Sequence, residues 1–423
     1  MNVLIIGNGG RENALAWKVK NSPLLKNLFI SPGNAGTYGL GKNIEIDISQ
    51  KTEILKFVKS NNIDLTLVGP EAPLEDGIVD LFISENQLIF GPSKKAAQIE
   101  TSKVWAKNIM KKHNIPTADF FSFNDFSSAK KFILSQKKIS WVIKADGLAS
   151  GKGVILTNNK EESMNALKEI LIDKKFGNAG NKIIIEEMLF GKEVSVFSFV
   201  NGKFVSSQIS ACDYKRSHDG DKGLNTGGMG SYSPPEFWNE NLSNTISEEI
   251  MIPTAKALVE ENVPFHGMLY GGIMLTSNGP KVLEFNCRFG DPETQVILPK
   301  LDSDILEICY NTAKKTLNEK TLVKWNNDNC VGVVITSGGY PKNYKIGHEI
   351  KLNSSPISNS LIFHSGTKIE NDGKITTNGG RVLVSVGIGK TMTIARNKAY
   401  KNIENIYFKN MYFRKDISER ALS

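Results

Sequence analysis

The chain has 423 residues, which is enough for about three domains of common size. Its hydrophobic content of 40% and charged content of 23% are typical of a globular protein. The net charge of +8 is spread along the chain without a long basic run, so small anionic ligands explain it better than nucleic acid does.

The cysteines and the N-terminus narrow the class of protein further. The 4 cysteines form no CxxC pair and have no histidine at a metal-ligand spacing, so we expect neither a zinc site nor a disulfide framework. The apolar run that opens the chain is too short for a signal peptide or a membrane span. We therefore expect a cytoplasmic protein.

The first hundred residues alternate between strand and helix patterns. Strands are predicted at 2–6, 27–31, 63–69 and 87–93, and helices at 10–20, 52–60 and 75–85. This rhythm predicts a parallel sheet covered by helices, with ligands bound at the carboxyl ends of the strands. Polar turns follow three of the strands: GNGGRE at 7–12, GPEAP at 69–73 and GPSK at 91–94.

The turn at 7–12 is not a dinucleotide fingerprint. Glu12 occupies the position of the third glycine, and no acidic residue ends the second strand to take a ribose. A nicotinamide cofactor is therefore not favoured. The N-terminus of the following helix could still hold an anion, although a tight turn without a ligand is equally compatible with these residues.

A long helix is predicted near 94–113, ended by Pro116, and a small unit follows at about 118–195. Within this unit, KADGLASGKGV at 144–154 joins two predicted strands. It is not a Walker A loop, because the glycine spacing differs and no helix follows. Its glycines could admit an anion to the backbone while Lys144 and Lys152 supply charge, and an ordinary basic hairpin is the alternative.

The stretch IIIEEMLFGKE at 183–193 is a buried-type strand that continues into a short linker. Backbone groups at such a linker could meet an adenine edge, and Glu193 could accept both hydroxyls of a ribose. A solvated turn with surface glutamates is the alternative.

The stretch KVLEFNCRFGDPE at 281–293 is the most specific in the chain. Alternation along a strand predicts two faces: Leu283, Phe285 and Cys287 toward a core, and Glu284, Asn286 and Arg288 on the opposite side. A carboxylate and an amide oxygen are hard ligands that suit Mg²⁺ and nucleotide phosphates. An adjacent arginine can stabilise a developing phosphoryl charge, which favours a functional site over a half-exposed strand with a salt bridge.

Residues 213–233 form a long polar stretch rich in glycine. Loops of this length are usually functional or disordered. Asp213, Lys215, Asn225 and Thr226 could bind a small polar substrate, and a flexible excursion is the alternative.

The rest of the chain contains more strand than helix patterns. One helix is predicted near 243–262, and after residue 326 we expect strands and hairpins with a turn at NDGK. A closing helix is predicted from the spacing of Ala395, Ala399, Ile403 and Ile406.

The order of these stretches resembles a known family. Together with SPGNAGT, GPSKKAAQIETSK, NTGGMGSYSP, SGGYP, FHSGT and GGRVL, they are similar to the phosphoribosylamine–glycine ligases, also called glycinamide ribonucleotide synthetases, of the ATP-grasp superfamily. The resemblance extends from Gly7 to about Asp416. It implies a mixed α/β and α+β fold with an N-terminal parallel-sheet domain (1–102), an ATP-grasp domain (103–325) with a flap subdomain at about 120–192, and a β-rich C-terminal domain (326–423).

The resemblance also implies a reaction. ATP would drive ligation of glycine to 5-phospho-D-ribosylamine through glycyl phosphate, giving glycinamide ribonucleotide, ADP and phosphate in purine biosynthesis. Mg²⁺ or Mn²⁺ would accompany ATP, and the partners would be these small molecules, with no nucleic acid and no membrane. We expect a monomer, with a dimer as the alternative. A related ATP-grasp enzyme with a different substrate, or a nucleotide binder without activity, are the competing functions.

Site residues are implied by position in the matching motifs. For ATP they are Lys103, Lys144, Gly151, Lys152, Gly153, Glu186, Glu187, Leu189 and Glu193, and for the metal Glu284 and Asn286. Arg288 and Lys144 would stabilise the charge of the reacting groups. The phosphoribosylamine would meet Gly10, Arg11, Glu12, Glu71 and Arg381, and glycine or the amine would meet Asp213, Lys215, Asn225 and Asp291.

Two positions depart from the family pattern. Members usually read GGREHA and DHKR, whereas Asn13 and Tyr214 stand here in place of the histidines. Asparagine cannot titrate near neutral pH, so an acid–base role at position 13 is in doubt.

Overall fold

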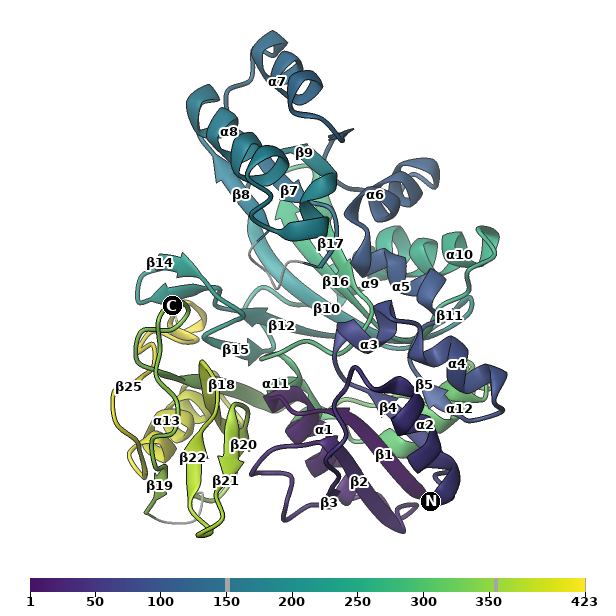
Figure 1. Ribbon diagram of the computed structural model, residues 1–423, viewed down its shortest axis with the longest axis vertical. Coiled ribbons are helices and arrows are strands. Elements are labelled where there is room, and N and C mark those ends of the chain that lie inside the picture. The colour runs from purple at the N-terminus through teal and green to yellow at the C-terminus, as the bar shows by residue number, and fades with distance from the viewer. Residues whose placement is uncertain (149–152, 354–356, 423) are drawn as a thin grey trace.

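The computed structural model describes residues 1–148, 153–353 and 357–422 (Figure 1). Gly151 and Lys152 of the predicted phosphate loop lie outside the described residues. The N-terminal part contains a parallel sheet in the order β3-β2-β1-β4-β5, which confirms the predicted strand–helix rhythm. Its strands are β1 (Asn2–Gly7), β2 (Asn27–Pro32), β3 (Lys42–Asn43), β4 (Leu65–Val68) and β5 (Ile89–Phe90).

Helices α1 (Gly10–Lys20) and α2 (Lys51–Ser60) lie where the sequence predicts them. The helix predicted at 75–85 is wrong in its start. Gly77 has a left-handed backbone with φ 81°, and it separates α3 (Glu71–Glu75) from α4 (Ile78–Ser84). Glycine adopts this conformation without the strain that a side chain would bring.

The single long helix predicted near 94–113 is also wrong. Ser102 has an extended backbone and divides the segment into α5 (Lys94–Thr101) and α6 (Lys103–Lys112). The Ser102 hydroxyl accepts a hydrogen bond from the Trp105 N–H at 3.2 Å and so caps α6. The break starts a new helix at Lys103, beside the loop that follows β7 (Trp141–Ala145).

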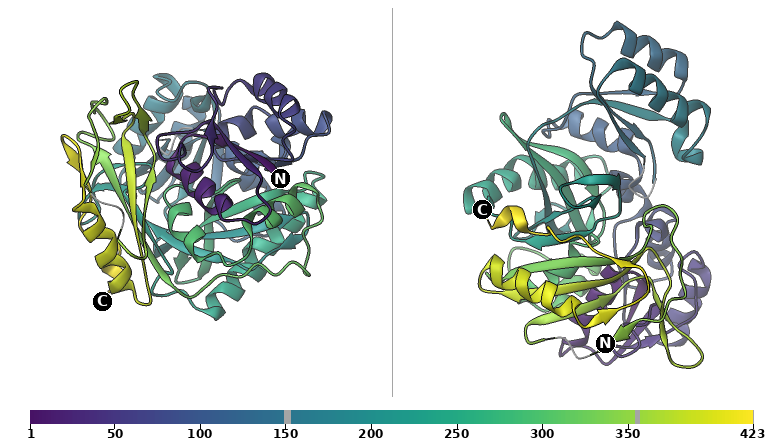
Figure 2. Two further views of the ribbon diagram at one scale, coloured as in Figure 1. Left: turned by 90° about the horizontal axis from the view of Figure 1, so that it is seen from below. Right: turned by 90° about the vertical axis from the view of Figure 1, so that its left-hand side faces the viewer.

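The flap subdomain is a small antiparallel sheet in the order β6-β9-β7-β8, with helices packed on it. Figures 1 and 2 show it projecting from one end of the molecule. Its core includes Ile133, Trp141, Ile143, Leu167 and Ile185. The remaining elements are β6 (Phe120–Phe123), β8 (Val154–Thr157), β9 (Ile183–Glu187), α7 (Phe126–Ser135) and α8 (Lys160–Leu167), which continues through a π-helical turn to Ile172.

A large sheet extends from the centre of the molecule into its C-terminal part, in the order β17-β16-β10-β12-β15-β18-β23-β20. The antiparallel pair β15–β18 joins the two parts, because Tyr232 lies opposite Val331. The division into domains at 1–102, 103–325 and 326–423 stays a prediction. The strands are β10 (Lys192–Asn201), β12 (Ile209–Asp213), β15 (Gly230–Ser233), β16 (His266–Thr276), β17 (Gly279–Asn286), β18 (Asn329–Ser337), β20 (Ser360–His364) and β23 (Arg381–Gly389), with β11 (Phe204–Val205) beside β10 and β25 (Met411–Tyr412) beside β18.

Several local predictions in this half are confirmed and several are wrong. The helix predicted near 243–262 forms as α9 (Glu240–Ile246), a π-helical turn and α10 (Ile252–Glu260), and the NDGK hairpin joins β21 (Thr367–Ile369) to β22 (Ile375–Thr377). The prediction of only one helix between residues 195 and 325 is wrong, since α11 (Thr294–Ile297) and α12 (Ile305–Ala313) also form. Helix α13 (Met392–Ile403) ends before Ile406, which instead lies in β24 (Ile406–Tyr407), paired with β19 (Lys351–Leu352). The stretch 213–233 contains the hairpin of β13 (Arg216–His218) and β14 (Lys222–Asn225).

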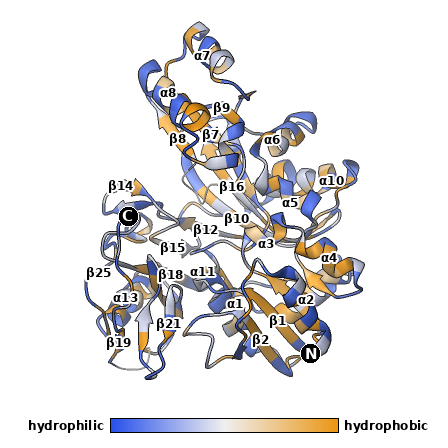
Figure 3. Ribbon diagram, in the orientation of Figure 1, coloured by the Kyte–Doolittle hydropathy of each residue, from blue (hydrophilic) through white to orange (hydrophobic). Residues whose placement is uncertain are grey.

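Buried apolar side chains hold these layers together. Figure 3 shows hydrophobic residues along β1 and β2, where Leu4 and Ile30 are fully buried. Within the described part of the chain, no helix combines the length and the apolar character that crossing a bilayer requires.

The contact of α13 with β23 generates a stability prediction. A Cβ at Gly387 would collide with the Ala395 carbonyl oxygen and lie 2.5 Å from the Ala399 nitrogen, whereas one at Gly39 would meet no heavy atom within 4 Å. Gly387→Ala should therefore cost about 1–3 kcal/mol or more, because α13 must move away from the sheet. Thermal unfolding of both variants tests this, and equal melting temperatures for Gly387→Ala and Gly39→Ala would contradict it.

Candidate functional site

Lys144 connects the flap subdomain to the central sheet. Its Nζ lies 2.9 Å from Glu186 Oε2 on the neighbouring strand β9 and donates a hydrogen bond of 3.1 Å to the Leu283 carbonyl of β17. Lys144 is 5% exposed and Glu186 is 2% exposed. Two predicted site residues therefore meet at the junction of the two sheets.

A second buried lysine, missed from the sequence, shares the same carboxylate. Lys107 Nζ lies 3.3 Å from Glu186 Oε2 and donates to Thr117 Oγ1 at 2.6 Å. Burial lowers the pKa of Lys107 to about 8, although Glu186 opposes the shift. The sequence signal was a lysine between Val104 and Met110 on the buried face of α6.

Lys107 and Lys144 both form ion pairs with Oε2 of Glu186 and not with Oε1. Glu186 Oε1 is buried and has no hydrogen-bond partner among the described residues. An unsatisfied buried acceptor is costly, so a hydrogen-bond donor from a ligand or from water would stabilise this oxygen.

The linker after β9 offers a second polar group. The Leu189 N–H makes no backbone hydrogen bond to a described residue, whereas the Glu187 N–H donates to the Asp119 carbonyl at 3.0 Å. The Glu187 carboxylate forms ion pairs with Lys138 and Lys281, each at 3.3 Å. At the far end of the linker, Glu193 pairs with Lys215.

Lys103 lies at the base of the loop between β7 and β8. Its Nζ donates a hydrogen bond of 2.9 Å to the Gly147 carbonyl. The Asp146 carboxylate accepts from the Val104 N–H at 3.1 Å, so the loop is attached to the start of α6. Gly153 closes the other side of the loop, where its carbonyl accepts from the Ala145 N–H at 2.9 Å.

Strand β17 contains an irregularity that the simple alternation missed. Glu284 lies opposite Gly272 while Val282 lies opposite Ile273, so Leu283 is an extra residue without a partner. Val282 is fully buried in the core and Leu283 is only partly buried, so the predicted core position of Leu283 is wrong. The predicted burial of Phe285 and Cys287 is confirmed.

Glu284 lies among positive side chains. Burial alone would raise the pKa of its carboxyl, but Lys144, Lys215, Lys103 and Arg288 together hold that pKa below its ordinary value. The carboxylate is therefore ionised at neutral pH through these side chains alone, before a metal ion binds.

Arg288 joins β17 to the N-terminal part. Its Nη2 pairs with Glu100 Oε1 at 2.9 Å and donates to Asn286 Oδ1 at 3.2 Å, and its Nε lies 3.2 Å from Glu71 Oε2. Burial would raise the pKa of Glu71, but Arg288 and Arg11 outweigh it and lower that pKa. Glu100 was not predicted from the sequence, and its only signal was a carboxylate on the buried face of α5.

The loop between β1 and α1 is held by Glu12. This side chain is 1% exposed, and its carboxylate accepts from the Gly9 N–H at 2.7 Å and from Arg11 Nε at 2.5 Å. A Cβ at Gly7 or Gly69 would collide with it. Glu12 therefore shapes the loop from within, and Arg11 Nη1 donates to the Phe289 carbonyl at 3.1 Å.

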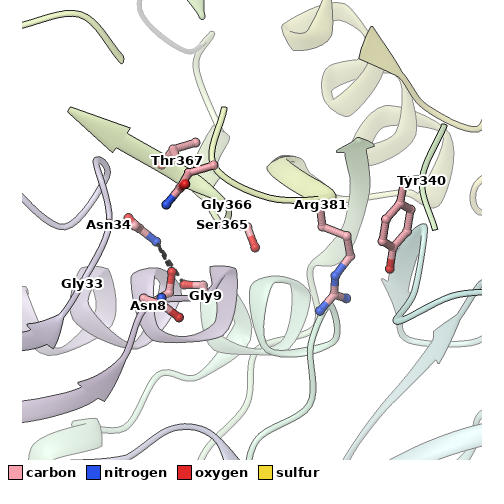
Figure 4. A pocket seen from close by; sticks show the side chains of 10 residues that line it. Asn8, Gly9, Gly33, Asn34, Tyr340, Ser365, Gly366, Thr367 and Arg381 are labelled. Carbon is pink, nitrogen blue, oxygen red and sulfur yellow. Dashed lines mark hydrogen bonds between the residues drawn. The ribbon is translucent and has the colours of Figure 1, made fainter. Parts of the chain in front are cut away.

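A cavity of about 250 Å³ lies between this loop and the C-terminal strands (Figure 4). Its lining consists of Asn8, Gly9, Gly33, Asn34, Tyr340, Ser365, Gly366, Thr367, Asn378 and Arg381. Arg381 Nη1 donates to the Asp291 carbonyl at 2.8 Å and pairs with Asp291 Oδ1 at 3.4 Å. Burial would raise the pKa of Asp291, but Arg381 and Arg11 lower it.

Asn13 connects α1 to the C-terminal strands. Its Oδ1 accepts a hydrogen bond of 2.7 Å from the His364 N–H, while Asn34 Nδ2 donates to the His364 carbonyl at 2.9 Å. The side chain that departs from the family pattern is thus engaged within the protein. Gly10 lies beside it, where a Cβ would come within 2.6 Å of Gln295 Nε2.

Of the remaining predicted residues, Asp213 lies near the Glu193–Lys215 pair. Burial raises the pKa of Asp213 to about 7, against the charge of Lys215 and with the help of Glu293 and Glu193. Glu293 is 3% exposed and accepts from the Tyr270 hydroxyl at 2.8 Å. Asn225 lies apart in the hairpin, opposite Arg216.

Comparisons with known proteins agree along the whole chain. The family descriptions that match are Phosphoribosylglycinamide synthetase, N domain, at residues 1–100, its ATP-grasp (A) domain at 101–294 and its C domain at 330–420. A phosphoribosylamine–glycine ligase of Halalkalibacterium halodurans is 43% identical over 100% of this chain and 98% of its own length. The crystal structure of a phosphoribosylamine–glycine ligase from Thermotoga maritima superposes with a TM-score of 0.86 at 34% identity, covering 99% of this chain and 100% of that one. A biotin carboxylase from Campylobacter jejuni shares the fold, with a TM-score of 0.75 at 15% identity over 97% of this chain and 92% of that one.

The buried contact at His364 generates a pH prediction. Burial lowers the pKa of His364 to about 4, so the unfolded chain binds more protons than the folded protein between that value and the ordinary 6.5. This histidine does not reduce the free energy of unfolding above about pH 6.5. As the pH drops toward 4, it lowers the free energy of unfolding by up to about 3 kcal/mol. Over this pH range, the melting temperature of His364→Gln should fall less steeply than that of the wild type. Parallel curves of melting temperature against pH would contradict the prediction.

Proposed function

We propose, for a chain that belongs to the phosphoribosylamine–glycine ligase family, that it joins glycine to 5-phospho-D-ribosylamine with ATP. The products are glycinamide ribonucleotide, ADP and phosphate, in purine biosynthesis. The observation that carries the proposal is the convergence of Lys144, Glu284 and Arg288 where the two sheets meet. Phosphoryl transfer depends on such positioned charge more than on covalent help from the protein.

The nucleotide fits the junction of the flap subdomain and the central sheet. Adenine presents an amino donor and a ring acceptor, and the unpaired Glu186 Oε1 and the Leu189 N–H offer the matching groups. We assign the ribose to Glu193. The phosphates are assigned to Lys103, Lys144 and the loop that ends at Gly153, and Glu187 helps to hold the linker.

The donor set at the end of β17 suits a divalent cation. Glu284 supplies an ionised carboxylate and Asn286 an amide oxygen, which are the hard ligands that Mg²⁺ and Mn²⁺ prefer. No group of three or more His, Cys, Asp or Glu side chains that could hold a metal occurs among the described residues, so nucleotide phosphates and water would complete the shell. When bound, the cation would draw charge from the γ-phosphoryl group.

The proposed reaction has two steps. A carboxylate oxygen of glycine attacks the γ-phosphorus, the bond to ADP breaks, and glycyl phosphate forms. The amine of phosphoribosylamine then attacks the acyl carbon, the nitrogen loses one proton, and phosphate leaves with that carboxylate oxygen. Arg288 and Lys144 stabilise the negative charge in both steps, and we assign glycine to Asp213 and Lys215.

The phosphoribosylamine fits the cavity beside the β1–α1 loop. The segment 365–367 and Arg381 surround it with donors, and Arg381 Nη2 makes no hydrogen bond to a described residue. We assign the 5-phosphate to this end and the ribose hydroxyls to Glu71. Gly10, Arg11 and Glu12 shape the loop around the sugar, while Asp291 faces the amine, and Asn225 keeps only a peripheral role.

The finer expectations belong to the same proposal. We propose that the protein works as a cytoplasmic monomer on small molecules. A related ATP-grasp ligase with another substrate is the alternative, and the match of all three family descriptions disfavours it.

The first test is ADP release with ATP, Mg²⁺, glycine and phosphoribosylamine generated from ribose 5-phosphate and ammonia. Release should require both substrates, and Glu284→Gln should reduce it at least about a hundredfold, because an amide cannot replace an ionised ligand. Glu53→Gln, on an exposed ion pair of α2, is the matched control. ADP release without the amine at the full rate, or normal turnover by Glu284→Gln, would count against the proposal.

Arg381 provides a test of the second substrate. Arg381→Ala should raise the KM for phosphoribosylamine about ten- to a hundredfold, since it removes a charge-assisted hydrogen bond, and leave the KM for ATP unchanged. Ribosylamine, which lacks the phosphate, shows whether Arg381 recognises the phosphate or the rest of the substrate. If it recognises the phosphate, wild type and Arg381→Ala should use ribosylamine equally poorly. If Arg381→Ala weakened both amines by the same factor, the phosphate assignment would be wrong.

A further inference from the structure

The last residues of the chain lie against the segment that carries Asp213 and Lys215. We call residues 412–420 the C-terminal strap. Figure 1 shows the C-terminus beside β14, almost two hundred residues away in sequence. No residue of the strap lines the cavity described above, so the proposed chemistry does not by itself account for it.

Arg414 anchors the strap. Its side chain is fully buried, and it forms a two-pronged pair with Asp416 at 2.7 and 2.6 Å. Its Nη1 also donates to Asp221 Oδ1 at 2.9 Å and to the Arg216 carbonyl at 3.0 Å. A planar guanidinium makes such a set of bonds, and a lysine could not.

Backbone groups extend the contact on both sides of Arg414. The Gly220 N–H donates to Asp416 Oδ2 at 2.9 Å, and the Lys415 N–H donates to Asp219 Oδ1 at 2.8 Å. The strap therefore holds the turn between β13 and β14 along its length.

Tyr214 contacts two arginines of the strap. Its ring is 4.6 Å from the Arg414 guanidinium carbon and 4.4 Å from that of Arg420, and the side chain is 4% exposed. Arg420 Nη2 also donates to the Asp213 carbonyl at 3.3 Å. A cation over an aromatic face is attracted to it electrostatically, so both arginines help to hold the ring.

The backbone at Tyr214 transmits this position to its neighbours. Tyr214 follows the last residue of β12, and its N–H donates to the Gly230 carbonyl at 2.9 Å while its carbonyl accepts from the Met229 N–H at 2.7 Å. These two bonds fix the backbone on both sides of the ring. Asp213 and Lys215 are the residues that flank Tyr214 in the chain, and both have Glu193 as a charged neighbour, with which Lys215 pairs.

We infer that the C-terminal strap positions Asp213 and Lys215 for glycine by holding the Tyr214 ring through Arg414 and Arg420. The inference rests on the proposed assignment of glycine to Asp213 and Lys215. Tyr214, Arg414 and Arg420 are positioning residues, since they act on the substrate only through their neighbours.

The test measures glycine affinity by calorimetry, with a non-hydrolysable ATP analogue and Mg²⁺ already bound. Tyr214→Leu and Arg414→Lys should each weaken glycine about ten- to a hundredfold, because small displacements of binding groups have such effects. Binding of the ATP analogue should stay unchanged. Tyr214→Phe should keep the glycine affinity, since it keeps the aromatic ring that Arg414 and Arg420 contact.

The controls separate positioning from general stability. Lys390→Ala removes an exposed ion pair with Asp328 elsewhere in the C-terminal part and should leave glycine affinity unchanged. If Tyr214→Leu does not fold, Arg414→Lys and Tyr214→Phe carry the test. Unchanged glycine affinity in Arg414→Lys, or equal losses for glycine and nucleotide, would overturn the inference. Absence of glycine binding to the wild type would instead overturn the proposed glycine site, and this inference with it.

Discussion

The buried charges where the flap subdomain meets β17 are the constraint on which the proposed nucleotide site depends. Arg288 is paired with Glu100 and Glu71, and Lys144 with Glu186. Removing one partner of such a pair leaves a charge that neither water nor protein compensates. The pairs therefore hold this junction in a charged arrangement before any ligand binds, so little reorganisation is needed when phosphate charge arrives.

One short segment connects the two proposed binding regions. Glu284 and Asn286 lie where the two sheets meet, Arg288 reaches Glu71, and Asp291 reaches Arg381 at the cavity. An acyl phosphate must meet the amine before water does. The continuous segment from residue 284 to residue 291 links the two proposed binding regions.

The parts of the structure that the sequence predicted are those with local causes. The N-terminal strands and helices follow from apolar periodicity, and the NDGK hairpin follows from its turn residues. The break at Ser102 and the extra residue at Leu283 depend on partners far along the chain, namely Asp146 and the register of β16. The same reason hid Lys107 and Glu100, because a buried charge looks like a surface residue until its partner is known. The motif resemblance supplied Lys144 and Glu284, whose environment only the folded chain reveals.

The most direct test of the proposed reaction follows a carboxylate oxygen of glycine into the released phosphate. In the proposed reaction, the protein phosphorylates the carboxylate of glycine before the amine attacks. With glycine labelled by ¹⁸O in its carboxylate, the phosphate released in a complete reaction should carry one labelled oxygen, as detected by mass spectrometry. Phosphate without the label, alongside normal formation of the amide product, would show that glycyl phosphate is not formed and would contradict the account.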